Sequence, residues 1–207
     1  MVEEKGFQLS RTSKMPGFSF SVPNLTCKTG SKLKKIPGSV CAKCYAGRGN
    51  YLWPNSKNLM GLRYAALRSK DWVPRMAAMI RAHESSGYFR WHDSGDLQGI
   101  WHLENICAVA RLLPEIRFWL PTKEGKLVDR FRATHGPEPG NLTIRVSAHM
   151  VGEVDTTRPV TSMVVGKHQT VVPANLFHCK APTQGNQCLL CRACWDRNVE
   201  LVGYKEK

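Results

Sequence analysis

The chain has 207 residues, of which 42% are hydrophobic and 22% charged, and its formal net charge is +14. This composition excludes a wholly disordered chain, and the length suits one globular domain with a substantial core. No apolar run approaches the roughly 20 residues that cross a bilayer, and the opening MVEEKGFQLS lacks the apolar core of a signal peptide, so we expect a cytoplasmic protein without a membrane partner.

Residues 1–54 form an N-terminal segment rich in Gly, Pro, Ser, Thr and Lys, with no sustained helical or alternating period. We therefore expect an irregular segment that wraps over the core. Its first 50 residues hold nine Lys or Arg against two Glu. Such a surplus raises the affinity for polyanions, so nucleic acid is a candidate partner, although a solvated loop that confers solubility explains the charge equally well.

Residues 55–174 show the alternating helical and strand periods of an α/β core. Apolar residues recur at helical spacing from Asn55, and again after Asp71, which is a candidate N-cap. Strands and helices then alternate, which predicts parallel strands joined by right-handed crossovers, in an open parallel sheet or a partial (β/α) barrel. The expected strands are 88–92, 116–120, 142–148, 160–165 and 169–172, with helices at 100–113 and around 127–131, the latter ending near Gly136.

Polar residues follow three of the expected strands, at the edge where parallel α/β folds bind their ligands. His92, Asp93 and Asp96 are candidate catalytic residues that would act as general acid and base or bind a sugar hydroxyl. The alternatives are that Asp96 caps the next helix and that His92 is a satisfied polar group of the core. Lys123 is either a phosphate contact or an ordinary lysine in the first turn of a helix.

Residues 175–207 form a tail with four cysteines, Cys179 and the run Cys188-x2-Cys191-x2-Cys194. Because thiols stay reduced in the cytoplasm, metal binding is favoured over disulfides. The run lets one short loop hold three corners of a [4Fe-4S] cluster, as in bacterial ferredoxins, and Cys179 would supply the fourth ligand. Zinc is the alternative metal, although zinc motifs normally come as two separated C-x2-C pairs.

A second group, Cys27, Cys41 and Cys44, has no obvious fourth cysteine. A [4Fe-4S] cluster held by three thiolates keeps one iron open to an outside ligand, and an open position distinguishes catalytic from structural metal sites. The alternative is a structural site completed by His or by a cysteine of the tail, so one shared cluster and two separate clusters both fit the spacing. Cys107 lies on the apolar face of its helix and is expected in the core.

Several motifs resemble a phage protein family named after gene product 88 of a mycobacteriophage. They are Ser13-Lys-Met-Pro-Gly17, Cys41-Ala-Lys-Cys44-Tyr-Ala-Gly47, His92-Asp-Ser-Gly-Asp96, Pro121-Thr-Lys123 and Cys188-x2-Cys191-Arg-Ala-Cys194-Trp195. The resemblance covers most of the chain and implies a protein of the host cytoplasm. It brings no secure activity with it.

The chain is similar, more distantly, to radical S-adenosylmethionine (SAM) enzymes, which have a partial (β/α) barrel preceded by three cysteines that hold an open [4Fe-4S] cluster. This resemblance implies that Ser94 and Gly95 bind the SAM amino group and that the tail holds an auxiliary cluster. Residues expected to meet the rest of SAM are Arg145, Ser147 and His149. The first cysteine gap departs from that family's pattern, with 13 residues instead of three, and Asp96 stands where a Glu is usual.

The leading hypothesis is therefore a phage-type iron-sulfur protein with radical-SAM-like chemistry. One alternative is a non-enzymatic, metal-stabilised basic protein that binds nucleic acid or a host protein. Another is a zinc-dependent nucleic-acid enzyme. Residue spacing does not identify a small-molecule substrate, because specificity depends on loop geometry.

Overall fold

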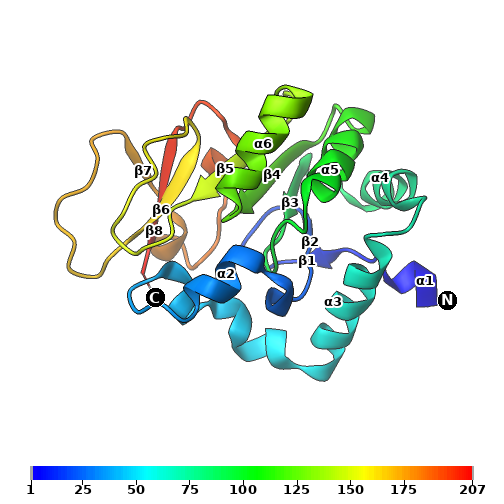
Figure 1. The fold of residues 1–207 in the computed structure, drawn as a ribbon, viewed down its shortest axis with the longest axis horizontal. Helices are drawn as coiled ribbons and strands as arrows, with labels where there is room; N and C mark the ends of the chain where they lie inside the picture. The colour runs from blue at the N-terminus through cyan, green and yellow to red at the C-terminus, as the bar shows by residue number, and fades with distance from the viewer. Residues whose placement is uncertain (1, 207) are drawn as a thin grey trace.

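An eight-stranded sheet forms the centre of the computed structural model, which describes residues 2–206 (Figure 1). Its strand order is β1-β2-β3-β4-β5-β6-β8-β7, and every neighbouring pair is parallel except β1 and β2. The predicted α/β class is confirmed, in its open-sheet form. The strands are β1 Ser10–Arg11, β2 Phe18–Phe20, β3 Tyr88–Trp91, β4 Arg117–Thr122, β5 Leu142–Ser147, β6 Thr161–Val165, β7 Leu176–His178 and β8 Leu201–Lys205.

Helices α4, α5 and α6 pack their apolar sides into one core with the sheet. Phe118 and Leu120 of β4 belong to this core, together with Ile80 of α4, Ile106 of α5 and Val128 of α6, and all five side chains are fully buried. Cys107 is also buried there, as predicted. The helices are α1 Val2–Lys5, α2 Lys28–Leu33, α3 Pro54–Ala66, α4 Trp72–His83, α5 Ile100–Leu112 and α6 Gly125–His135.

The periodic elements of the middle of the chain are confirmed, with two corrections. No strand forms at 169–172, where the side-chain amide of Gln169 donates to the carbonyls of Gly152 and Val171. Both sides of β6 are paired with other strands, β5 and β8. Asp71 precedes α4 but makes no capping bond. Its carboxylate accepts from the Ser69 hydroxyl and pairs with Arg75.

Both flanking segments contribute strands that the sequence pattern did not predict. The N-terminal segment is not irregular throughout, because β2 pairs with β3 (Ser19 with Arg90) and α2 follows it. At the other end of the chain, β8 lies between β6 and β7. These strands are too short to show a clear alternation of apolar and polar residues, so their place in the sheet depends mainly on partner strands far away in the sequence.

The C-terminal segment covers the sheet face opposite the helices. Trp195 is buried there against the rings of Tyr88 and Trp119, and its indole N–H donates to the carbonyl of Phe89 at 2.9 Å. The hydroxyl of Thr143 donates to the carbonyl of Trp195 at 2.8 Å. Trp195 thus attaches the tail to the middle of the sheet. Within residues 2–206, no helix has the length and apolarity needed to cross a membrane.

Candidate functional site

The three N-terminal cysteines lie together at the carboxyl edge of the sheet, beside α2. A Cβ placed on Gly30 of α2 would lie 3.6 Å from the sulfur of Cys41 and 3.7 Å from that of Cys27. The distance between the two sulfurs is therefore smaller than the sum of these two values. Burial raises the pKa of Cys27 well above its ordinary value, and the charges of Asp96, Cys44 and Cys41 raise it further. The fold therefore brings together the three thiols that the sequence grouped.

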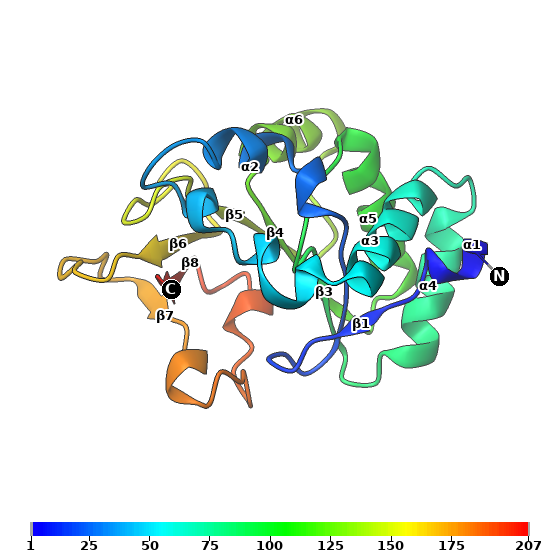
Figure 2. The ribbon, with the colours of Figure 1, turned by 90° about the horizontal axis from the view of Figure 1, so that it is seen from below.

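Hydrogen bonds attach this cysteine segment to the ends of β4 and β5. The backbone N–H and the hydroxyl of Thr29 donate to the carboxylate of Glu124, at 2.8 and 2.9 Å. The N–H of Val40 donates to the carbonyl of His149 at 2.9 Å, and the hydroxyl of Ser39 accepts from the N–H of Ala42 at 3.1 Å. Figure 2 shows α2 and the segment after it crossing this edge of the sheet. Sequence reasoning did not identify Glu124, which has no motif of its own.

Asp96 links the loop after β3 to the end of β4. Its carboxylate accepts from the N–H of Leu97 and of Lys123, both at 2.8 Å, and from the hydroxyl of Thr122 at 2.5 Å. Asp96 is not a helix cap, since the N-cap of α5 is Gly99. Burial raises the pKa of Asp96 to about 6, although these hydrogen bonds favour the charged form. The carboxylate is thus held in one orientation beside the cysteines.

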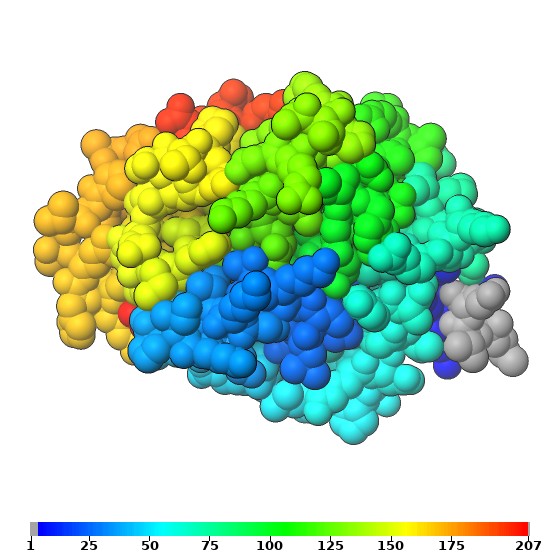
Figure 3. Space-filling model, in the orientation of Figure 1, coloured from blue at the N-terminus to red at the C-terminus, as the bar shows by residue number. Residues whose placement is uncertain are grey.

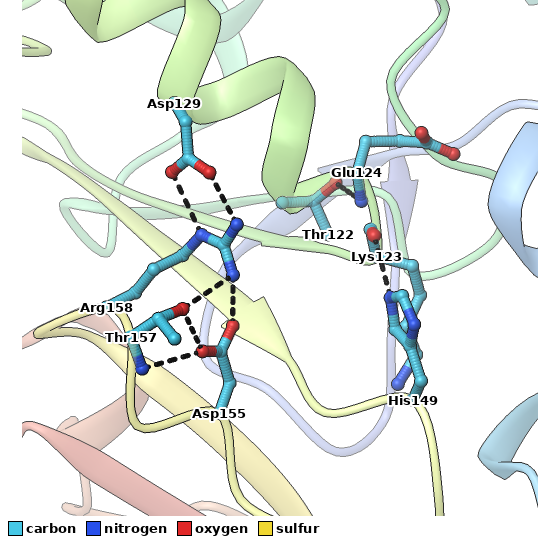
Figure 4. A network of polar contacts seen from close by, with 8 residues as sticks. All are labelled: Thr122, Lys123, Glu124, Asp129, His149, Asp155, Thr157 and Arg158. Carbon is cyan, nitrogen blue, oxygen red and sulfur yellow. Dashed lines mark hydrogen bonds and ion pairs between the residues drawn. The ribbon is translucent and has the colours of Figure 1, made fainter.

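Lys123 reaches across the same edge. Its ammonium donates to the carbonyl of Ala148, and its own carbonyl lies 3.2 Å from Nε2 of His149. Figure 4 shows these two residues next to Thr122 and Glu124. Burial lowers the pKa of Lys123, while the charges of Cys41 and Asp96 raise it. Lys123 is therefore a cation beside the cysteines, and not an exposed lysine of a first helical turn.

A separate ion-pair network holds the loop that follows β5 against α6. Arg158 contacts the carboxylates of Asp129 and Asp155, and Thr157 donates to Asp155 (Figure 4). A Cβ on Gly125 would lie 2.8 Å from the guanidinium carbon of Arg158, so glycine at this position lets the arginine lie against the start of α6. The network thereby fixes the start of α6 against the segment that follows β5.

His92 is buried but not satisfied, contrary to one of the two sequence interpretations. Its φ of 55° is in the left-handed region, which is uncommon for a residue other than glycine. Neither ring nitrogen forms a hydrogen bond to any described residue, and its ring lies 5.2 Å from that of His102. Burial lowers the pKa of His92 well below its ordinary value, and the charges of His102 and Arg90 lower it further.

Asp93 and Gly95 define the loop between His92 and Asp96. The carboxylate of Asp93 accepts from the hydroxyl of Tyr51 at 3.0 Å, and its carbonyl accepts from that of Tyr45 at 2.5 Å. Gly95 has a φ of 81°, and a Cβ there would lie 2.3 Å from the side chain of Val22. The hydroxyl of Ser94 is buried and makes no hydrogen bond to the described residues.

Arg145 and Ser147 do not face this site, although both were expected to meet a ligand there. The guanidinium of Arg145 is fully buried under the tail, where it donates to the carbonyls of Ala193 at 3.1 Å and Asp196 at 3.0 Å. The hydroxyl of Ser147 lies 3.0 Å from that of Ser162. The alternation of β5 places Thr143, Arg145 and Ser147 on the face that the tail covers.

The four tail cysteines line one small hollow of about 20 Å³. Burial raises the pKa of Cys194 to about 11, while the hydroxyl of Tyr204, 3.2 Å from its sulfur, and the charge of Arg145 lower it. All eight cysteines of the chain lie within the described residues, and all are free thiols. Among residues 2–206, no three His, Cys, Asp or Glu side chains converge closely enough to ligate one metal ion. Metal binding at either group therefore stays a prediction.

Comparison with known proteins gives one match. The family model for Gene product 88 matches residues 2–197, which is most of the chain. No curated protein and no solved structure gives a significant match. The more distant resemblance to radical SAM enzymes gains no support from these comparisons, whereas the phage-family resemblance is confirmed. The chain belongs to the Gene product 88 family.

Proposed function

We propose that Cys27, Cys41 and Cys44 hold a [4Fe-4S] cluster with one iron open to an exchangeable ligand. The observation that carries this proposal is the position of the three thiols at the carboxyl edge of a parallel sheet, with Cys27 and Cys41 beside Gly30 and Cys44 close enough to raise the pKa of Cys27. This edge is where open parallel sheets bind their ligands. In a cubane cluster each thiolate binds a different iron, so the ligands need not converge on a single ion.

The electrostatics of the site favour a bound cationic centre. Burial raises the pKa of Cys27 and of Cys41, and the charges of Asp96 and Cys44 raise both further. Iron binding would deprotonate them and turn the same repulsion into attraction. Buried thiols that raise one another's pKa gain more from a bound cation than isolated thiols do.

The residues beside the thiols suit the positioning of a polar ligand. Asp96 is fixed by three hydrogen bonds, and Lys123 offers a half-buried cation held by the carbonyl of Ala148. When bound, the cluster would supply a Lewis-acidic open iron and a one-electron reservoir, the chemistry that radical SAM enzymes use. Asp96 and Lys123 would orient an amino or carboxylate group of the ligand and exclude water from it.

The tail supports a second, closed cluster held by Cys179, Cys188, Cys191 and Cys194. Four thiolates and an iron-sulfur core carry net negative charge, which burial disfavours unless a cation lies close. Arg145 is fully buried, has no carboxylate partner among the described residues, and interacts electrostatically with Cys194. A buried guanidinium without an acidic partner fits an anionic centre at this position.

Anaerobic reconstitution tests the proposal through iron and sulfide content. We expect brown protein with broad absorption at about 400 nm and about eight irons per chain if both clusters form. Cys41→Ala should remove about half of the iron and Cys191→Ala the other half. Cys107→Ala is the matched control, because Cys107 is buried in the core away from both groups. Colourless protein with stoichiometric zinc would contradict the proposal, and loss of all iron in either variant would indicate one shared cluster.

A further inference from the structure

Almost all of the net positive charge of this protein comes from one uninterrupted stretch. From Lys5 to Lys70 the chain contains 13 Lys or Arg and no Asp or Glu, whereas the rest of it carries 17 basic and 16 acidic residues. The stretch therefore supplies 13 of the 14 net positive charges, and the rest of the chain is almost neutral. Because this run contains no acidic residue, none of its cations has an acidic neighbour within the run itself.

The fold spreads this stretch over the side of the molecule that holds the three N-terminal cysteines. In Figure 1 it runs in blue and cyan through β1 and β2 at one edge of the sheet and then through α2 and α3 in the lower part of the molecule, where Figure 3 shows the same colours forming a continuous surface. Within the described residues, the stretch makes a single ion pair, between Lys43 and Glu206. Its remaining exposed cations are free of acidic partners there. Those between residues 30 and 60 are Lys32, Lys34, Lys35, Arg48 and Lys57.

Exposed aromatic and apolar side chains belong to the same stretch. Trp53, at the N-terminus of α3, is 61% exposed, and its neighbour Leu52 is 48% exposed. Tyr64, further along α3, is 42% exposed. A tryptophan that leaves most of its surface in water is unusual in a globular protein, because burying the ring is strongly favourable. An exposed indole beside unpaired cations has the components of a stacking site for an unpaired base.

We propose that this basic face, formed by Trp53 and the cations Lys32, Lys34, Lys35, Arg48 and Lys57, binds single-stranded nucleic acid. The cations follow the phosphates and Trp53 stacks on a base. Duplexes are disfavoured, because their bases are already stacked and present no open π-face. The segment that bears Trp53 lies against the one that follows Cys44, since the rings of Tyr45 and Tyr51 are 5.8 Å apart, so a strand bound at Trp53 lies near the cysteine site. That the strand is also the substrate rests on the proposed function, whereas binding itself does not.

Binding of a fluorescein-labelled oligothymidylate of about 20 nucleotides, followed by anisotropy over a range of salt concentrations, tests the inference. Trp53→Ala should weaken binding at least fivefold, while Trp53→Phe should stay near wild type. The double variant Lys34→Glu, Lys35→Glu should reduce the slope of log K against log salt by about 1.4, the value expected for two lost phosphate contacts. The matched control, Arg111→Glu with Arg130→Glu, changes the net charge equally but lies on α5 and α6.

The inference is overturned if the control pair weakens binding as much as the Lys34 and Lys35 pair, because net charge alone would then explain the affinity. It is also overturned if a duplex of the same length binds as tightly as the single strand, or if Trp53→Ala binds like wild type. Iron content measured on the same samples reports on the proposed function separately. Cys41→Ala should lose iron and still bind the oligonucleotide.

Discussion

Arg145→Met should lower the free energy of unfolding by about 3–5 kcal/mol, as expected when one partner of a buried charged network is removed. The side chain is fully buried and donates to the carbonyls of Thr161 at 2.9 Å, Ala193 at 3.1 Å and Asp196 at 3.0 Å. Methionine fills similar space but leaves these carbonyls without a donor, and each such loss costs about 1–3 kcal/mol. Urea unfolding followed by tryptophan fluorescence measures the change.

Arg197→Met provides the matched control. Arg197 also donates to two backbone carbonyls, those of Pro139 at 3.1 Å and Leu142 at 3.0 Å, but it is exposed, so water replaces the lost bonds. We expect its effect to stay within about 1 kcal/mol. Equal destabilisation by the two variants would contradict the view that Arg145 holds the tail cysteines onto the sheet.

The two histidines that are buried in their neutral form should lower stability on mild acidification, and the raised pKa of Asp96 offsets part of this loss. Burial lowers the pKa of His102 to about 3, with a further contribution from the charge of Arg68, and burial also lowers that of His92. In the unfolded chain both titrate near about 6.5, so below that pH the unfolded state binds more protons and unfolding is favoured. From pH 7 to pH 5, His102 alone should remove about 2 kcal/mol, and His92 adds to the loss.

Urea midpoints recorded between pH 7 and pH 5 test this prediction. His102→Gln should flatten the dependence by about 1.4 kcal/mol per pH unit near pH 5. His168→Gln, a change at an exposed histidine, should leave it as in wild type. If His102→Gln and wild type showed the same slope, His102 would have to take up its proton in the folded state as readily as in the unfolded chain.

The elements predicted from the sequence are those whose periodicity is local. Helices α3 to α6 and strands β3 to β6 each carry enough apolar repeats to show their period. Strand β2 has three residues, and β8 is placed by its partners β6 and β7, so the information that specifies them lies elsewhere in the chain. The strand expected at 169–172 does not form, and both sides of β6 are occupied by strands distant in the sequence or further along it, β5 and β8.

The grouping of the cysteines was predicted from spacing, whereas the surroundings of Arg145 and His92 were not. Chain position placed Arg145 at the end of a strand, but the face it occupies is decided by the alternation of β5 and by the tail packed on that face. The pKa of His92 is lowered by its burial and by the charge of His102, which lies ten residues away on α5. Tertiary packing determines the surroundings of both residues, and the spacing of residues in the sequence carries no information about that packing.

The central claim is that Cys27, Cys41 and Cys44 bind an iron-sulfur cluster independently of the tail. Its most direct measurement is the iron and sulfide content of the variant in which Cys188, Cys191 and Cys194 are all replaced by alanine. After anaerobic reconstitution we expect about four irons and four sulfides per chain, lost again when Cys41→Ala is added. Folded triple-variant protein that retains no iron would contradict the claim.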